Sequence, residues 1–167
     1  NAQVVNGVDY GARDNPANTY EMTHTDILGQ RFDSEYLTLK DDVTGAQIIA
    51  LTTSRHSNSK YYQTHPSWTP DGKHIVFRSS RGKQDGQRFG GFAYAISMDT
   101  YDITQVTTDD WGTNLHLGWK KNLAYFFHKG QLKALNLGQL LSDSAKNKVG
   151  PPDSYLTVLG TLPEGMR

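Results

Sequence analysis

Residues 61–81, YYQTHPSWTPDGKHIVFRSSR, decide how the rest of the chain is interpreted. The stretch predicts one strand at residues 64–69, a tight turn at residues 70–73 and a second strand at residues 74–79. Between them, Pro70 fixes φ, Asp71 can bond to nearby backbone amides, and Gly72 can adopt a positive φ. The stretch is therefore predicted to form a tight β-hairpin.

The composition is that of one folded domain without a strong electrostatic bias. The 167 residues suffice for a domain with its own core, and 36% of them are apolar, so the chain is expected to fold. A formal net charge of zero argues against a broad nucleic-acid surface. The lack of cysteine excludes disulfides and thiolate sites. No apolar run reaches the roughly 20 residues of a membrane span.

Short alternating runs predict strands along most of the chain. No segment of helix length has a sustained helical period, so the fold is predicted to be all-β, with a helical turn at residues 137–144. A short strand is also expected around Val4 and Val5, and Phe32 is a core candidate. The other predicted strands are residues 35–39, 47–52, 92–98, 103–107, 115–119, 123–127, 132–137 and 155–159.

These strands repeat. Trp68 recurs about 50 residues later as Trp119, and each tryptophan precedes a turn and an aromatic-bearing strand. Four antiparallel strands at this period predict β-propeller blades, with both tryptophans as core wedges between blades. Residues 1–34 are expected to be an N-terminal arm or partial blade. Residues 35–167 are expected to hold two full blades and parts of their neighbours.

Two sets of residues carry a family resemblance. His65-Pro-Ser-Trp-Thr-Pro-Asp-Gly-Lys-His-Ile-Val-Phe-Arg-Ser resembles the repeat motif of TolB-type, WD40-like propellers. Over residues 35–167 the chain resembles the propeller-type polysaccharide lyases that act on oligogalacturonate or ulvan. Such propellers have about seven or eight blades, so the remaining blades are expected in another segment or chain. The wider motif is Asp42-x-x-Gly45, Leu51-Thr52, Tyr61-Tyr62, Thr64-His65-Pro66, Trp68-Thr69 and Asp71-Gly72.

The geometry of a propeller blade predicts on which face of the propeller each loop lies. The hairpin turns at residues 70–73 and 120–122 are expected on the bottom face. The loops at residues 53–63, 81–91 and 108–114 are expected on the top face, with Arg78 and Arg81 near the same mouth. The predicted top-face residues are Arg55, His56, Tyr61, Tyr62, Lys83, Arg88 and Trp111.

His65 and His116 occupy the same register, His-x-x-Trp, in adjacent blades. Both are expected at the upper end of an innermost strand, near the central channel. A single histidine in a β protein is more often structural than catalytic, but its repetition at equivalent positions favours a shared site. We take His65 and His116 as candidate base or carboxylate-neutralising groups and Tyr62 as a candidate acid or base.

The loop at residues 55–63 combines basic, amide and phenolic side chains. The paired N–H donors of an arginine guanidinium suit carboxylate or sulfate groups, and the flat face of a tyrosine ring suits a sugar ring. A solvated loop without a ligand remains the alternative interpretation. The predicted substrate-binding residues are Arg55, His56, Tyr61, Asn114 and Arg88, with Arg55 and Asn114 on the substrate carboxylate.

The resemblance implies β-elimination on a uronate, in which a neutralised carboxylate acidifies the C5 proton, a base removes it and the C4 oxygen leaves. It also implies histidines that bind a manganese-like cation. This chain offers two well-placed histidines and no third, so no metal site is predicted within it. A divalent cation (Mn, Ca or Zn) is instead expected in the complete propeller.

The leading hypothesis is a secreted or periplasmic polysaccharide lyase acting on an anionic, uronate-containing glycan such as ulvan or oligogalacturonate. The alternative is a non-catalytic TolB-like propeller that binds a protein or peptide. A peptidase propeller is disfavoured because the sequence contains no G-x-S-x-G elbow. A lyase predicts that His65 and His116 open onto one basic, aromatic-rimmed site, whereas a protein-binding propeller predicts that they are sealed.

Overall fold

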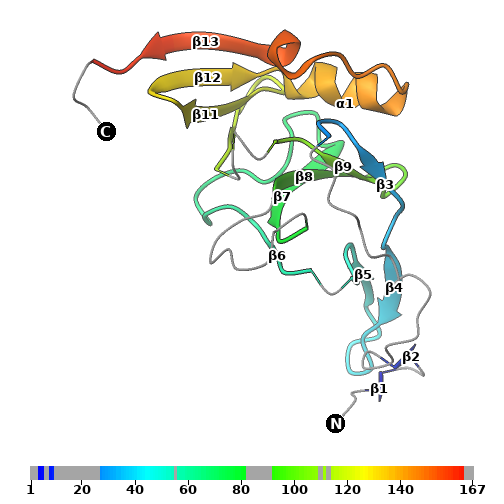
Figure 1. Ribbon diagram of the computed structural model, residues 1–167. Coiled ribbons are helices and arrows are strands. Elements are labelled where there is room, and N and C mark those ends of the chain that lie inside the picture. The colour runs from blue at the N-terminus through cyan, green and yellow to red at the C-terminus, as the bar shows by residue number, and fades with distance from the viewer. Residues whose placement is uncertain are drawn as a thin grey trace.

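The computed structural model describes residues 4–5, 8–9, 27–54, 56–81, 92–108, 111 and 114–163. The described part is built from antiparallel strands with one α-helix, which confirms the predicted all-β class and the arrangement of a partial β-propeller (Figure 1). Two sheets form adjacent blades, and a separate hairpin lies at the other end of the molecule. Within these residues no helix is long and apolar enough to cross a membrane.

The first blade contains the hairpin at residues 66–79. Its strands are β7 (His74–Ser79), β8 (Phe92–Ser97) and β9 (Ile103–Gln105), and Trp68 adds an inner bridge to Ile75. Two short strands extend the sheet. β3 (Arg31–Phe32) pairs with β9 at one edge, and β6 (Asn58–Ser59) pairs with β7 at the other.

The turn of this hairpin forms as its residues predict. Gly72 has a φ of 71°, and the Thr69 hydroxyl donates to the Asp71 carboxylate at 2.7 Å. The amide of Thr69 also donates to the carbonyl of His74 at 2.9 Å. The inner strand is shorter than the predicted residues 64–69 because the chain turns before Pro66, with the His65 amide donating to the Tyr62 carbonyl at 2.8 Å. β6 takes its place beside the upper part of β7.

The second blade is a four-stranded sheet in sequence order. It consists of β10 (His116–Leu117), β11 (Ala124–His128), β12 (Gln131–Leu135) and β13 (Leu156–Thr161). Between β12 and β13 the chain forms α1 (Leu137–Ala145) and the short 3-10 helix η2 (Pro152–Tyr155). The helical turn predicted at residues 137–144 is thus present and extends by one residue. Asn136 caps the helix, its side chain accepting from the Gln139 amide, and the apolar side of the helix is buried.

Helix α1 also contacts the segment that precedes β3. The buried Ser144 hydroxyl donates to the Gly29 carbonyl at 2.6 Å. The amide of Gly29 donates in turn to the carbonyl of Gln105 in β9 at 2.9 Å. The helix thus joins the second blade, residues 28–30 and the outer edge of the first blade.

A two-stranded hairpin precedes the first blade in the chain. β4 (Leu37–Lys40) pairs with β5 (Gln47–Ala50), and the Asp41 carboxylate accepts from the Thr44 amide in the turn between them. This hairpin lies away from the second blade (Figure 1). Near the N-terminus, β1 (Val4–Val5) pairs with β2 (Val8–Asp9), so the strand expected at Val4 and Val5 is present.

The main core fills the space between the two blades. Val76 and Ala95 of the first blade pack with Leu117, Phe126 and Leu135 of the second, together with the buried side of α1. The opposite face of the first blade carries a second cluster, formed by Phe77, Phe92, Tyr94, Ile96 and Ile103, against which Phe32 packs. Alternation along β7 and β8 therefore buries both faces of the first blade.

The two tryptophans do not have the predicted role as core wedges. Trp68 is 49% exposed and Trp119 is 77% exposed. Trp68 makes a single bridge at the inner edge, and Trp119 lies in the turn after β10. The space between the blades is filled instead by Val76 and Phe126, from the second strand of each blade. The prediction was wrong because it placed the repeated tryptophans, rather than side chains of the second strand of each blade, at the interface.

Candidate functional site

The structure brings His65 and His116 together. Their ring centroids are 4.7 Å apart, with the ring planes inclined at 57°. Tyr62 contacts His65 edge-on, with ring centroids 6.1 Å apart. His116 and Tyr62 are exposed and His65 is half-buried, so the group is open to solvent. Two candidate bases and a phenol therefore meet at one accessible position.

Local structure explains why these rings meet. His65 follows the turn at residues 62–65 that leads into the inner bridge of the first blade. His116 begins β10, the inner strand of the second blade, where it pairs with Tyr125. The two residues thus lie at equivalent ends of adjacent inner strands. In a propeller these ends face the central channel.

Tyr61 lies differently from the predicted sugar-stacking position. Its side chain is 6% exposed and belongs to the core between the blades. The Arg78 guanidinium covers its ring at 5.6 Å from the centroid. Burial raises the pKa of Tyr61 above its usual range, although the positive charge of Arg78 opposes that rise. The phenol is therefore protonated at neutral pH, and its ring supports Arg78 rather than presenting a free face to a sugar.

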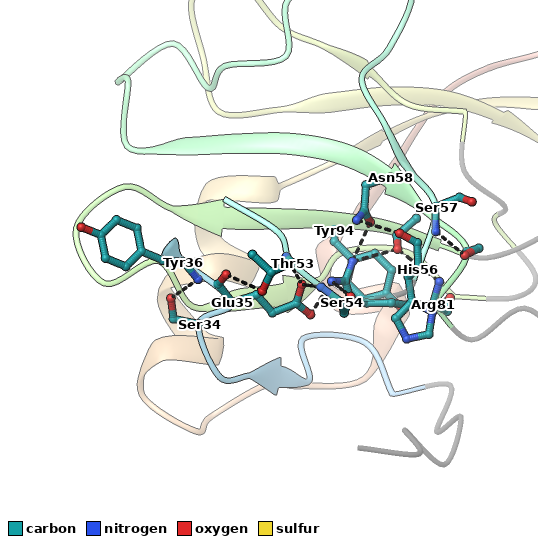
Figure 2. Close-up of polar contacts among 12 residues, drawn as sticks. Ser34, Glu35, Tyr36, Thr53, Ser54, His56, Ser57, Asn58, Arg81 and Tyr94 are labelled. Carbon is teal, nitrogen blue, oxygen red and sulfur yellow. Dashed lines mark hydrogen bonds and ion pairs between the residues drawn. The ribbon is translucent and has the colours of Figure 1, made fainter. Parts of the chain in front are cut away.

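Arg81 and Glu35 form an ion pair, in which the arginine is fully buried, against the start of the loop at residues 53–63 (Figure 2). The Arg81 side chain is fully buried, so the prediction that it lies at an open mouth is wrong. Its guanidinium donates to Glu35, to the Ser54 hydroxyl at 2.9 Å and to the Asn58 side-chain carbonyl at 2.7 Å. An uncompensated guanidinium would be costly at this depth, and these acceptors compensate it.

The Glu35 carboxylate extends this network to the loop that leads to the histidines. Its second oxygen accepts from the amides of Thr53 and Ser54, both at 3.1 Å (Figure 2). Burial raises the pKa of Glu35, but the hydrogen bond and charge of Arg81 outweigh it, so the pKa lies below its ordinary value. Glu35 is ionised at neutral pH and holds the start of the loop against the first blade.

His56, predicted to bind substrate, lies beside the same network. It is half-buried, and its backbone carbonyl accepts from the Asn58 side chain at 3.1 Å. Burial, followed by the positive charge of Arg81, lowers the pKa of His56 below its ordinary value, although Glu35 opposes the shift. His56 is therefore a neutral imidazole at pH 7, suited to hydrogen bonding rather than to ion pairing with an anion.

The other residues predicted for the top face are partly exposed, partly buried and partly outside the described residues. Asn114 is exposed, two residues before His116. Arg55 and Arg88 lie outside the described residues, as do Lys83 and His24. Trp111 is buried and packs on Phe126 with ring centroids 5.6 Å apart, so it is a core residue rather than a surface residue of the top face.

Sequence reasoning missed Glu35 altogether and gave Arg81 the wrong environment. One signal was present: Phe77, Ser79 and Arg81 follow the alternation of a strand whose face is buried. An arginine at the end of that row requires an acidic partner if it is buried. The sequence did not identify Glu35 as that partner, because the two residues meet only through the fold.

The described residues do not form a metal site. No group of three or more histidine, cysteine, aspartate or glutamate side chains in this part of the chain could hold a metal ion. The close pair, His65 and His116, supplies only two imidazole ligands. By themselves these residues do not fit a manganese-type cation, which requires more ligands than two.

No protein-family model matches the sequence, and no curated protein matches it either. Two solved structures do share its arrangement of blades. Both are oligogalacturonate lyases. One, described as a complex with manganese, has a TM-score of 0.57 and 21% identity over 81% of this chain. The other, from Vibrio parahaemolyticus, has a TM-score of 0.58 and 18% identity over 83% of this chain.

The match to the oligogalacturonate lyases covers this chain well but those proteins only in part. The aligned region is 32% of each lyase chain, so the chain spans about a third of the length of the structures it resembles. At this level of identity the likeness establishes the fold, a part of a β-propeller. The chemistry of the lyases does not follow from the fold alone.

Proposed function

We propose that this chain is part of a polysaccharide lyase that cleaves a uronate-containing glycan by β-elimination. The observation that carries the proposal is the contact between His65 and His116, which places two imidazoles at equivalent blade ends and open to solvent. The fold shared with oligogalacturonate lyases supports the same reaction class. The remaining blades, in another segment or chain, would complete the channel.

The geometry suggests a division of roles. One imidazole of the pair would remove the C5 proton of the uronate, and the other would stabilise the charge that develops on the carboxylate. Tyr62, exposed and in edge contact with His65, would donate a proton to the departing C4 oxygen. The proton acceptor and the proton donor would then lie in one contact group.

The proposed substrate is an anionic polysaccharide such as oligogalacturonate or ulvan, met outside the cell or in the periplasm. Elimination leaves a C4–C5 double bond conjugated with the carboxylate, which absorbs in the ultraviolet. The test is to incubate the intact protein with oligogalacturonate, ulvan and alginate and to follow this absorbance. Product from one of them supports the proposal and names the substrate.

The matched variants are His65→Ala, His116→Ala and His74→Gln. His74 lies at the hairpin-turn end of β7, away from the pair, and serves as the control. General-base catalysis contributes about 100-fold or more, so the first two variants should lose at least that factor and the third should not. Absence of unsaturated product from every uronate would overturn the lyase proposal and favour a non-catalytic propeller that binds a protein or peptide.

A further inference from the structure

We propose that Arg78 is the anion-binding residue of this site and that it holds the acid group, carboxylate or sulfate, of the bound sugar. The inference rests on the proposed function for its substrate class. Three arginine side chains lie within the described residues. Arg31 pairs with Asp102 and Arg81 pairs with Glu35. Among the residues that the structure describes, Arg78 has no carboxylate partner, although it is partly buried.

Arg78 belongs to the same group of contacts as the histidines. Its guanidinium lies over the ring of Tyr61. The next residue, Tyr62, touches His65, and His65 touches His116. On the other side, Tyr61 belongs to the same core cluster as Leu115, the residue directly before His116. The guanidinium is therefore connected to the histidine pair from both sides through Tyr61.

The surroundings of Arg78 fix its side chain without neutralising it. One terminal nitrogen donates to the Lys60 carbonyl at 3.2 Å, and the ring of Tyr61 supports one face of the guanidinium. Its Nε is buried without a hydrogen-bond partner among the described residues, and so is the Tyr61 hydroxyl. Cation–π contact and one carbonyl orient the group but leave its charge and several donors available.

The described surroundings of Arg78 provide no anion, and a bound anion would complete them. A partly desolvated guanidinium without a counter-charge is unfavourable, and a bound acid group would offset that cost. The fork of arginine donors matches two oxygens of a carboxylate or sulfate, and an immobilised side chain loses less entropy when it binds. Arg81 cannot serve this purpose because it is fully buried and already paired with Glu35.

The test is calorimetric binding of three probes to the intact protein: trigalacturonate, its methyl ester and a sulfated rhamnose oligosaccharide. Trigalacturonate carries carboxylates, its methyl ester carries no anionic group, and the sulfated rhamnose oligosaccharide carries only sulfate. The comparison therefore distinguishes carboxylate from sulfate binding. Arg78→Gln should weaken binding of the preferred acid probe by roughly tenfold or more and leave binding of the ester unchanged. Arg78→Lys should fall between, because it keeps the charge but loses the fork.

Arg31→Gln is the control, because that arginine already has an acidic partner in Asp102. It should bind all three probes as the wild type does. The inference is overturned if Arg78→Gln retains the wild-type preference for acid over ester, or if the wild type shows no such preference. If Arg78→Gln does not fold, Arg78→Lys is compared with the wild type in its place, and it should show a reduced preference for acid over ester.

The same variants separate this inference from the proposed function. If acid probes bind through Arg78 but no unsaturated product forms, the lyase proposal fails and the anion site stands. If the protein cleaves a uronate and Arg78→Gln leaves KM and kcat unchanged, the lyase proposal stands and the role of Arg78 is refuted.

Discussion

Glu35 and Arg81 are separated by 46 residues in sequence and meet in an ion pair in which the arginine is fully buried. The pair joins the segment before β4 to the end of β7, and through Thr53 and Ser54 it also fixes the loop that leads to Tyr62 and His65. A charge at this depth is rarely retained without such a structural role.

Breaking this pair should destabilise the protein strongly. Arg81→Met or Glu35→Gln leaves one charged or polar partner buried without compensation, and we expect a loss of about 3–5 kcal/mol in the free energy of unfolding. Urea denaturation followed by tryptophan fluorescence measures it. The more exposed pair Arg31–Asp102 provides the control, and Arg31→Gln should cost about 0–1 kcal/mol. Equal losses at both pairs would contradict the structural role assigned to Arg81.

Stability should fall with acidification in two stages. The pKa values of His56 and His74 are lowered in the folded state, so unfolded chains bind these protons first, and stability declines as the pH falls below about 6.5. The pKa values of Glu35 and Asp71 are also lowered, so a further decline begins below about 4.3.

Thermal unfolding across pH tests both stages. In His56→Gln the upper decline should flatten in part, because His74 still contributes to it, while the lower one remains. The lower decline should persist in part in Glu35→Gln, because Asp71 is still present. An upper stage that is unchanged in His56→Gln would contradict the contribution assigned to His56.

The two histidines should behave as one catalytic unit. If each single variant lowers kcat/KM about 100-fold or more, the double variant His65→Ala/His116→Ala should be little worse than the poorer single variant. Steady-state kinetics on the preferred uronate measures this. Losses that multiply would indicate that the two rings act independently, in spite of their contact.

The turn between the first two strands of the first blade should depend on Gly72. Its φ of 71° disfavours a side chain, although an added Cβ would meet nothing within 4 Å. Gly72→Ala should therefore cost about 1 kcal/mol through backbone strain alone. Gly160→Ala, in equally open space but without the positive φ, should cost less. Similar values for both would show that the turn adjusts to the substitution.

The parts of the molecule that were predicted correctly depend on local pattern and period. The hairpin follows from Pro70, Asp71 and Gly72, and the adjacency of His65 and His116 follows from the same register in consecutive blades. The surroundings of Tyr61 and Arg81 were not predictable in this way. Their burial depends on how the irregular loop at residues 53–63 folds back over the blade, which strand periodicity does not encode.

The prediction that the two tryptophans are buried was wrong for a related reason. A repeat shows that two residues are equivalent, but it does not show which face of the strand they occupy. Trp68 and Trp119 are both exposed. They are therefore alike, as the repeat predicted, but they are not buried between the blades. In the same way, the repeated histidines were identified by register. That Arg78 has no carboxylate partner among the described residues became visible only from the partners of the other described arginines.

The contact between Ser144 and Gly29 has a consequence for how the protein opens. Because α1 bonds to residues that are themselves bonded to β9, neither blade can separate without breaking the helix contacts as well. The two blades and residues 28–30 should consequently exchange their protected amide hydrogens together, as one cooperative unit. The hairpin β4–β5 contacts the first blade only near its ends, through the Glu35–Arg81 pair, the Tyr36–Tyr101 stack and Leu51 among the described residues, and should open earlier and independently.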